Sequence, residues 1–268
     1  MTEARMQETA DYKPGTFCWV ELATTDSNAA KSFYTQLFGW TYNDISAGPD
    51  MVYTMLQLDG KEVGALFQMT PDMTAQGIPP NWLSYVSVAN ADETSDKAKA
   101  NGATVMKGPF DVQTVGRMAV IQDPTGAVFA IWQPGTHKGA EIYNVPNTFC
   151  WNELATRDTA KAGNFYSSVF NWNKNTQNFG PMEYTIFENE GKGNGGMFAI
   201  TPEMGNLPPH WLPYFAVDDC DAKAKKAADL GGKIMKPADN IPGVGRFAIL
   251  LDPQGAAFAI IKLDNPQT

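Results

Sequence analysis

The sequence predicts an α+β protein with two tandem domains, each built from two modules in which a strand and a helix precede three further strands (βαβββ). Three observations lead to this fold class. The chain has 268 residues, and one domain takes roughly 150. Residues 15–40 align without gaps on residues 147–172, so the chain contains an internal repeat. Within each repeat, apolar residues recur with the spacing of a strand, then of a helix, then of strands again.

The repeat extends beyond its first segment and places the expected domain boundaries. Shorter matches follow in the same order in both halves: PPNWL at 79–83 and PPHWL at 208–212, VGR at 115–117 and 244–246, and DPTG at 123–126 and DPQG at 252–255. Residues 135–146 are polar and rich in turn formers, as is typical of a connection. We therefore expect an extended or disordered arm over 1–14, domain 1 over 15–139, a linker over 140–146 and domain 2 over 147–264.

The opening of each domain predicts a strand followed by a capped helix. Residues 17–24 alternate between two faces, as a strand does. Asp26 is suited to the N-cap of the next helix, and Gly39 is suited to its C-terminal end. Between them, apolar side chains have helical spacing at Ala30, Phe33, Tyr34, Leu37 and Phe38. Domain 2 repeats this arrangement from Asp158 onward.

The remaining elements of domain 1 follow from apolar runs separated by turn residues. Strands are expected over 52–58 and 63–69, and a Pro-rich break then leads to the second module. That module is expected to contain a strand over 83–88, a helix over 91–100, and strands over 104–107, 117–122 and 127–132. The DPTG turn joins the last two strands.

Composition and charge argue against several classes of protein. Asp and Glu number 29 against 20 Lys and Arg, a net charge of −9, so the basic surface that nucleic-acid phosphates require is not expected. No apolar run approaches the ~20 residues of a membrane span, and residues 1–14 are too polar for a signal peptide. Three cysteines without a CxxC pair favour a reducing compartment. We expect a cytoplasmic monomer or homodimer that binds neither nucleic acid nor membrane.

The sequence offers little to bind a cofactor. It contains no Walker motif and no GxSxG motif, which argues against nucleotide binding and serine hydrolysis. Only two histidines exist, His137 and His210, so a site built from several imidazoles cannot form. We expect no cofactor.

Several short motifs occur twice in the same order and carry a resemblance to a known superfamily. They are Ser32-Phe33-Tyr34 and Asn164-Phe165-Tyr166, Phe38-Gly39-Trp40 and Phe170-Asn171-Trp172, and the two DPxG turns. With these motifs the chain resembles the vicinal oxygen chelate superfamily, which includes glyoxalase I, bleomycin-resistance proteins and extradiol dioxygenases. More narrowly, it is similar to the two-domain glyoxalase-like proteins of actinobacteria, which are often labelled hydroxylases. The resemblance implies mixed sheets that curl into open cups.

The resemblance also implies where a metal would bind in each cup. The usual ligands are a His or Gln on the first strand, a His on the first strand of the second module and a Glu on the last strand. In this chain these positions hold Trp19, Leu83 and Ala130 in domain 1, and Trp151, Leu212 and Ala259 in domain 2. Divalent metals need oxygen, imidazole or thiolate ligands, so no metal site is expected. His210 precedes such a strand and is interpreted as a hydrogen-bonding residue of the cup rim, in contact with the ligand.

Two glutamates are the strongest candidates for a functional role. Strand alternation places Glu21 on the same face as Trp19, and Glu153 on the same face as Trp151. A carboxylate in the cup could act as a general base with a raised pKa, or accept a hydrogen bond from a ligand. The sequence equally allows a structural role, in which each glutamate pairs with a basic side chain.

Arginines and further tryptophans complete the candidate site. Arg117 and Arg246 could pair with the glutamates across the sheet, which we favour, or bind an anionic group of a ligand. Trp82, Trp132 and Trp211 could line the cups and stack on a planar ligand, although packing in a core explains most such residues.

These observations favour a protein that binds a small organic molecule, for example an aromatic one, in a cup without the superfamily's metal. The alternative is an enzyme of the superfamily, a lyase, isomerase or dioxygenase, that uses Glu21 or Glu153 as its base or metal ligand. A third alternative is that one domain only supports the other. Whether a cup forms within one domain or between two stays open from the sequence.

Overall fold

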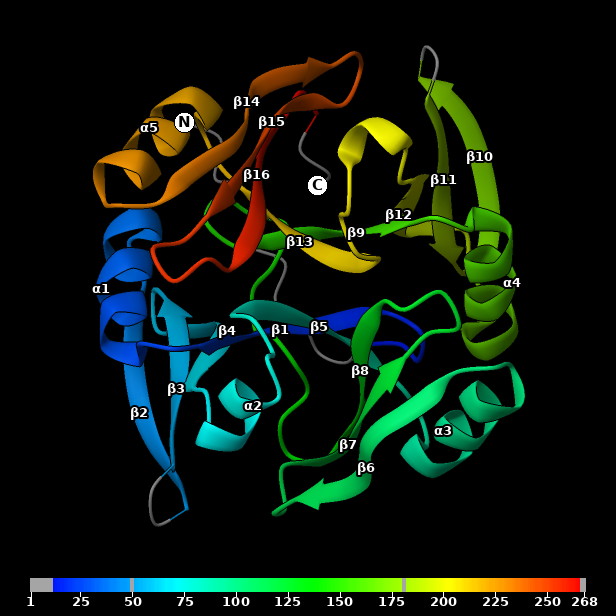
Figure 1. Ribbon diagram of the computed structural model, residues 1–268. Coiled ribbons are helices and arrows are strands. Elements are labelled where there is room, and N and C mark those ends of the chain that lie inside the picture. The colour runs from blue at the N-terminus through cyan, green and yellow to red at the C-terminus, as the bar shows by residue number, and fades with distance from the viewer. Residues whose placement is uncertain (1–11, 49–50, 180–181, 266–268) are drawn as a thin grey trace.

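The computed structural model describes residues 12–48, 51–179 and 182–265, and the chain forms two domains of the same architecture (Figure 1). The helices of domain 1 are α1 (Ser27–Phe38), α2 (Pro71–Ala75) and α3 (Ala91–Ala100). Its strands are β1 (Phe17–Thr24), β2 (Thr41–Gly48), β3 (Met51–Leu58), β4 (Lys61–Gln68), β5 (Asn81–Ser87), β6 (Thr104–Val112), β7 (Gly116–Gln122) and β8 (Val128–Pro134).

Domain 2 repeats this succession of elements. Its helices are α4 (Thr159–Phe170), α5 (Cys220–Asp229) and a short 3₁₀ helix, η1 (Pro202–Met204). Its strands are β9 (Phe149–Thr156), β10 (Asn173–Phe179), β11 (Met182–Asn189), β12 (Lys192–Ala199), β13 (His210–Ala216), β14 (Lys233–Ile241), β15 (Gly245–Leu251) and β16 (Ala257–Leu263). The predicted α+β fold, with two βαβββ modules in each tandem domain, is confirmed.

Each domain holds its two modules in one curled sheet. β1 pairs in parallel with β4 of its own module and antiparallel with β5 of the next, and β5 pairs in parallel with β8. The resulting strand orders are β2-β3-β4-β1-β5-β8-β7-β6 and β10-β11-β12-β9-β13-β16-β15-β14. Because the modules that share a sheet belong to the same domain, each cup forms within a domain.

The helix α1 forms where the sequence predicts it because both of its ends are capped. Asp26 accepts a hydrogen bond from the backbone N–H of Ala29 at 2.9 Å. Gly39 adopts a left-handed conformation with φ of 75°, which glycine tolerates without strain. The predicted apolar positions of this helix are all buried. In domain 2, Asp158 caps α4 and Asn171 takes the left-handed position at its end.

Two elements of domain 1 lie outside the residue ranges expected for its strands and helices. β2 has the sequence TYNDISAG, which carries little apolar alternation, and its side chains are mostly exposed. It forms by pairing with β3 at the edge of the sheet, rather than by burial. The helix α2 is a single turn after the Pro-rich break, and the Thr70 side chain accepts a hydrogen bond from the Met73 N–H at its start.

The core lies mainly between the two domains. Figure 1 places the central strands of the two sheets next to each other, with α1 beside α5 and α3 beside α4. One apolar cluster joins Leu22 and Trp82 of domain 1 to Phe215 and Phe258 of domain 2. The outer, convex faces of the two sheets are therefore buried against each other, and their concave faces point away from the interface.

The repeated sequence motifs meet at this interface. The Tyr34 hydroxyl donates to Asp252 Oδ2 at 3.0 Å, and the Tyr166 hydroxyl donates to Asp123 Oδ2 at 2.8 Å. The other oxygen of Asp123 accepts backbone N–H groups of its own DPTG turn, including that of Thr125 at 2.7 Å. Each helix tyrosine thus binds the DPxG turn of the other domain, so these motifs hold the domains together.

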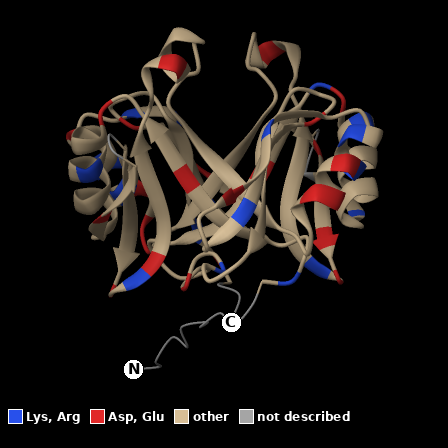
Figure 2. Ribbon diagram, turned by 90° about the horizontal axis from the view of Figure 1, so that it is seen from below, with Lys and Arg blue, Asp and Glu red and all other residues tan. Residues whose placement is uncertain are grey.

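Three further features concern the N-terminal arm, the helices and the surface charges of the chain. Residues 1–11 of the predicted arm lie outside the described residues, whereas the Tyr12 hydroxyl donates to the Ala140 carbonyl at 2.8 Å. Within the described residues, none of the helices combines the length and the apolar character that a membrane crossing requires. Figure 2 shows Lys and Arg interspersed among Asp and Glu over helices and strands.

Candidate functional site

Glu21 lies on the concave face of the first sheet, where two tyrosines bind its carboxylate. Val20 and Leu22 are fully buried in the interdomain core, so the alternate residues Trp19 and Glu21 point into the cup. The Tyr53 hydroxyl donates to Glu21 Oε2 at 2.6 Å. The hydroxyl of Tyr85, from β5, donates to Glu21 Oε1 at 2.9 Å.

Glu153 has the same surroundings in the second cup. The Tyr214 hydroxyl donates to Glu153 Oε1 at 2.6 Å, and Tyr184 also hydrogen-bonds this carboxylate. The indole N–H of Trp151 donates to the Tyr184 hydroxyl at 3.0 Å, just as the indole of Trp19 donates to Tyr53 at 3.3 Å. Each cup therefore contains one carboxylate, two tyrosines and one tryptophan, here called the carboxylate cluster.

Burial and hydrogen bonding act in opposite directions on these carboxylates. Burial raises the pKa of Glu21 and of Glu153, because a low-dielectric site disfavours the charged form. The hydrogen bonds from the tyrosines partly lower each pKa, and the nearby Lys107 lowers that of Glu21 further. Such a carboxylate can accept a hydrogen bond from a ligand or take up a proton.

The tyrosines were not predicted, and a signal for them exists in the repeat. Tyr53 on β3 corresponds to Tyr184 on β11 in the repeat, and Tyr85 on β5 corresponds to Tyr214 on β13. Tyr85 and Tyr214 face the cups because they pair with Trp19 and Trp151. Tyr53 and Tyr184 face them because their partners on β4 and β12 pair in turn with Ala23 and Ala155, which share a face with the glutamates. A polar residue repeated on the cup face of two strands would have indicated partners for the glutamates.

Trp132 lies in the first cup together with His137, which is not among the predicted site residues. The Trp132 indole N–H donates to the His137 carbonyl at 3.0 Å, and Trp132 is 6% exposed. The His137 ring packs edge-on against Trp19, with centroids 4.6 Å apart. Its Nδ1 lies 3.3 Å from Glu62 Oε2. The segment after β8 therefore brings an imidazole to one end of the first cup, where it meets the Glu62 carboxylate of β4.

His210 lies at the start of β13, on the cup face of the second sheet. It is two residues from Leu212, which pairs with Glu153 across β9 and β13, so both side chains face the same way. Its Nδ1 is 2.8 Å from the Pro208 carbonyl. Burial lowers the pKa of His210, which favours the neutral ring. Its contact with a ligand stays a prediction.

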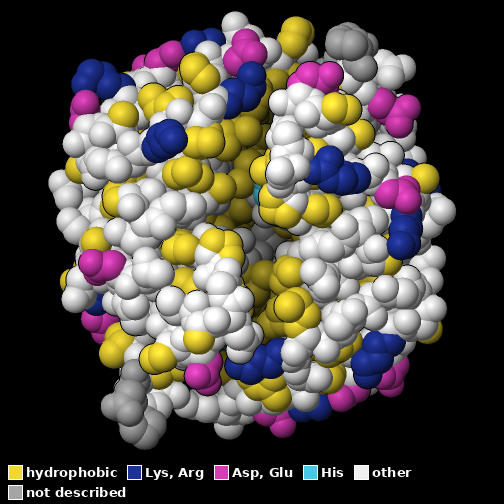
Figure 3. All heavy atoms as spheres, viewed as in Figure 1, with side chains coloured by type: hydrophobic (Ala, Val, Ile, Leu, Met, Phe, Trp, Pro, Cys, Tyr) yellow, Lys and Arg dark blue, Asp and Glu magenta, His cyan; other side chains and the backbone are white. Residues whose placement is uncertain are grey.

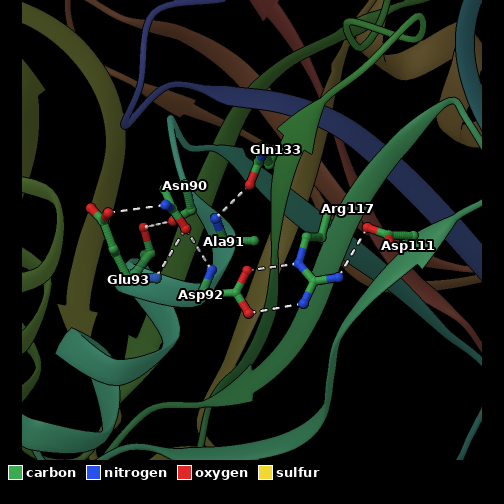
Figure 4. Close-up of polar contacts among 8 residues, drawn as sticks. Asn90, Ala91, Asp92, Glu93, Asp111, Arg117 and Gln133 are labelled. Carbon is green, nitrogen blue, oxygen red and sulfur yellow. Dashed lines mark hydrogen bonds and ion pairs between the residues drawn. The ribbon is translucent and has the colours of Figure 1, made fainter.

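The predicted pairing of Arg117 with Glu21, and of Arg246 with Glu153, is wrong. Arg117 donates to both carboxylate oxygens of Asp92 at 2.7 and 2.8 Å, and to Asp111 at 2.9 Å (Figure 4). Arg246 donates in the same way to Asp221 at 2.6 and 2.8 Å. The reason is strand parity, because Met118 pairs with Trp132 in the cup and its neighbour Arg117 therefore faces the helix side.

The predicted placement of Trp82 and Trp211 in the cups is also wrong. Both lie between the domains, where they are 4% and 5% exposed. The indole of Trp82 donates to the Tyr34 hydroxyl at 2.9 Å, and that of Trp211 donates to the Tyr166 hydroxyl at 2.7 Å. The next residues on β5 and β13, Leu83 and Leu212, face the cups instead.

The sequence of the chain matches a known superfamily in both domains. The sequence pattern of the Glyoxalase/Bleomycin resistance protein/Dioxygenase superfamily matches residues 16–131 and 148–260. The chain belongs to this superfamily. The two matched segments coincide with the two curled sheets, so the glyoxalase superfamily unit occurs twice in the chain.

Two sequence relatives cover nearly the whole chain. The protein named "Putative glyoxylase CFP32" of Mycobacterium tuberculosis is 42% identical over 259 residues, which span 96% of this chain and 98% of the relative. The "Anthracycline biosynthesis protein DauV" of a Streptomyces species is 34% identical over 265 residues, 94% of each chain.

Solved structures of the glyoxalase superfamily share the fold at low sequence identity. The Mn(II)-bound glyoxalase from Novosphingobium aromaticivorans has a TM-score of 0.65 and 16% identity, and the comparison covers 95% of this chain and 86% of that one. The 2,3-dioxygenase LapB from Pseudomonas has a TM-score of 0.63 and 10% identity, with 95% of each chain covered. At these identities the similarity supports the fold alone.

The residues of the cups do not fit a metal ion such as the Mn(II) bound by the Novosphingobium glyoxalase. The three expected ligand positions hold Trp, Leu and Ala in both domains, and none of these side chains is a metal donor. Within 12–48, 51–179 and 182–265, no three His, Cys, Asp or Glu residues are grouped to hold a metal ion.

Gly191, Gly193 and Gly196 have the GxGxxG spacing of dinucleotide-binding loops. Such loops join a strand to a helix, whereas these glycines lie on the hairpin of β11 and β12. The spacing therefore does not form a dinucleotide-binding loop here.

Proposed function

We propose that this member of the glyoxalase superfamily binds a small planar organic molecule on the concave faces of its sheets, and that it does so without a metal ion. The observation that carries the proposal is the carboxylate cluster, which occurs in both cups. A tryptophan beside a buried carboxylate supplies apolar area and one oriented acceptor, which is the usual composition of a small-molecule site.

The surface of the molecule supports this proposal. In Figure 3, hydrophobic side chains line hollowed regions over both domains on the face that Figure 1 also shows. The carboxylate oxygens of Glu21 each accept one tyrosine hydroxyl, and a carboxylate oxygen can accept a second donor. The name of one relative assigns it to anthracycline biosynthesis, and anthracyclines contain a planar system of fused rings.

A pair of probes tests the proposal. We expect 2,6-dihydroxyanthraquinone, which is planar and whose two hydroxyl donors are remote from its carbonyls, to bind and to quench tryptophan fluorescence. The double variant Glu21→Gln/Glu153→Gln should weaken this binding by about 1.5 to 3 kcal/mol, or roughly 10- to 150-fold in Kd, because a hydrogen bond to a charged acceptor is lost.

Two controls accompany this titration. Anthraquinone without hydroxyl groups should bind wild type and the double variant alike. Glu183→Gln changes an exposed glutamate next to Tyr184 in the chain and should leave the Kd unchanged. A Kd for 2,6-dihydroxyanthraquinone that is indifferent to both cup glutamates would place the ligand site elsewhere.

The metal content can be measured independently. We expect less than about 0.1 equivalent of Zn, Ni, Fe or Mn per chain after dialysis of protein purified without a His tag, because the ligand positions hold Trp, Leu and Ala. One equivalent of such a metal retained per domain, and lost in the double glutamine variant, would contradict the metal-free proposal.

One observation favours an enzyme as the second candidate. Burial raises the pKa of Glu21 and of Glu153, and a raised pKa makes a carboxylate a stronger general base. In this case a carboxylate oxygen takes a proton from a bound hydroxyl or an acidic C–H, and the substrate keeps the electron pair. Turnover of a bound ligand that is abolished by Glu→Gln in one cup would favour this candidate over binding alone.

A further inference from the structure

The two cups share the carboxylate cluster but differ in the residues around it. In the first cup, Glu62, Ala65, Trp132 and His137 lie near the cluster. The repeat aligns the first three with Gly193, Gly196 and Ile261 in the second cup. It aligns His137 with Pro266, which is outside the described residues, and the only other histidine is His210. Each of the first three differences gives the second cup a smaller side chain.

Gly196 lets Tyr184 lie flat against the second sheet. A Cβ atom at residue 196 would be 1.9 Å from the Tyr184 hydroxyl oxygen, so any side chain there would push the tyrosine into the cup. In the first cup Ala65 takes this place, since Ala65 pairs with Glu21 as Gly196 pairs with Glu153. The methyl group of Ala65 keeps Tyr53 from occupying the equivalent position.

Trp132 fills space in the first cup that is left free in the second. Its ring covers Gly116, where an added Cβ would be 2.2 Å from the ring. The corresponding residue, Ile261, pairs with Phe247 as Trp132 pairs with Met118. Phe247 is partly exposed and stacks on Tyr214, with ring centroids 6.2 Å apart. The second cup therefore has the smaller Ile261 side chain in place of an indole, and the Phe247 ring in place of Met118.

The end of the first cup is blocked by His137. Its ring lies 4.6 Å from the centroid of Trp19 and 5.8 Å from that of Trp132, and Glu62 holds it from β4. As a result, Trp19 is only 4% exposed, whereas Trp151 in the second cup is partly exposed. Figure 3 agrees, because hydrophobic side chains line the hollow over domain 2 more continuously than that over domain 1.

We propose that the two cups select ligands by size, so that a ligand of several fused rings enters only the second cup, between Trp151 and Phe247 with Glu153 as its acceptor. The first cup is left to ligands of a single ring. Gly196 and Ile261 are then the residues that determine this specificity. The inference rests on the proposed function, and its test separates the two.

The test compares single substitutions at matched positions, with 2,6-dihydroxyanthraquinone as the probe. Wild type should bind one molecule per chain. Glu153→Gln should raise the Kd at least 10-fold, and Glu21→Gln less than 2-fold. Gly196→Ala should also raise the Kd at least 10-fold, whereas Ala65→Gly should not. If Gly196→Ala fails to fold, as judged by circular dichroism, Ile261→Trp closes the second cup by a different route.

A gain of binding gives the converse test. The variant Ala65→Gly/Trp132→Ile/His137→Ala opens the first cup and should take up a second molecule of the probe, and Glu21→Gln should remove that second site. Two molecules bound to wild type, or an equal loss of affinity from Glu21→Gln and Glu153→Gln, would overturn size selection while the proposed function stands. A Kd that neither glutamine variant changes would overturn the proposed function itself.

Discussion

Glu21 and Glu153 couple the stability of the protein to pH. Their pKa values are raised in the folded state above the ordinary value of 4.5, because burial disfavours the charged carboxylate more than the tyrosine hydroxyls favour it. Between pH 4.5 and the raised pKa, the folded state therefore binds more protons than the unfolded state. It follows that this contribution to stability is complete below pH 4.5 and is lost as the pH rises through the folded pKa.

We expect this loss to be visible in the double variant. Between pH 4.5 and 7.5, the free energy of unfolding of wild type should fall relative to that of Glu21→Gln/Glu153→Gln, by about 1.4 kcal/mol for each unit by which a folded pKa is raised. Urea unfolding at constant ionic strength measures it, with Glu183→Gln as the control that follows wild type. Parallel pH curves for wild type and the double variant would contradict it.

At the scale of elements, the sequence predicts those helices and strands whose ends and buried faces are set by side chains close in the chain. The ends of α1 follow from Asp26 and Gly39, which cap it within the chain. β2 could not be predicted in this way, since pairing with β3 forms it. Trp82 was misplaced because both faces of β5 are buried, one in the cup and one between the domains. The partner of Arg117 is Asp92 on α3, so a helix placed across the sheet decides that pairing.

The hydroxyl of Tyr166, at the centre of α4, should contribute measurably to the free energy of unfolding. Tyr166→Phe removes the hydroxyl that donates to Asp123 and accepts from the Trp211 indole. Two buried polar groups then lose a partner, and we expect a loss of about 1 to 3 kcal/mol in the free energy of unfolding. Tyr42→Phe, at an exposed site, is the control. A loss below about 0.5 kcal/mol for Tyr166→Phe would show that water replaces the hydroxyl.

For the whole molecule, the sheets of the two domains pack against each other and share one core. Phe17 of domain 1 lies 5.0 Å from Trp211 of domain 2 between ring centroids, and Trp82 lies 5.3 Å from Phe215. The indoles of Trp40 and Trp172 also donate across the interface, to the carbonyls of Asn147 and Gly15. Neither domain could unfold alone without exposing the apolar surface of the other, while both cups, on the far faces, stay free to differ.

This arrangement predicts that the two domains unfold together. Loss of one domain would remove apolar contacts worth about 25 cal/mol per Å² from the other, so partly unfolded chains should not accumulate. We expect one transition in urea, with coincident curves from tryptophan fluorescence and far-ultraviolet circular dichroism. Tyr34→Phe in domain 1 and Tyr166→Phe in domain 2 should each move the whole transition to lower urea. Two separate transitions, of which each variant moves only the one belonging to its own domain, would show instead that the domains fold independently.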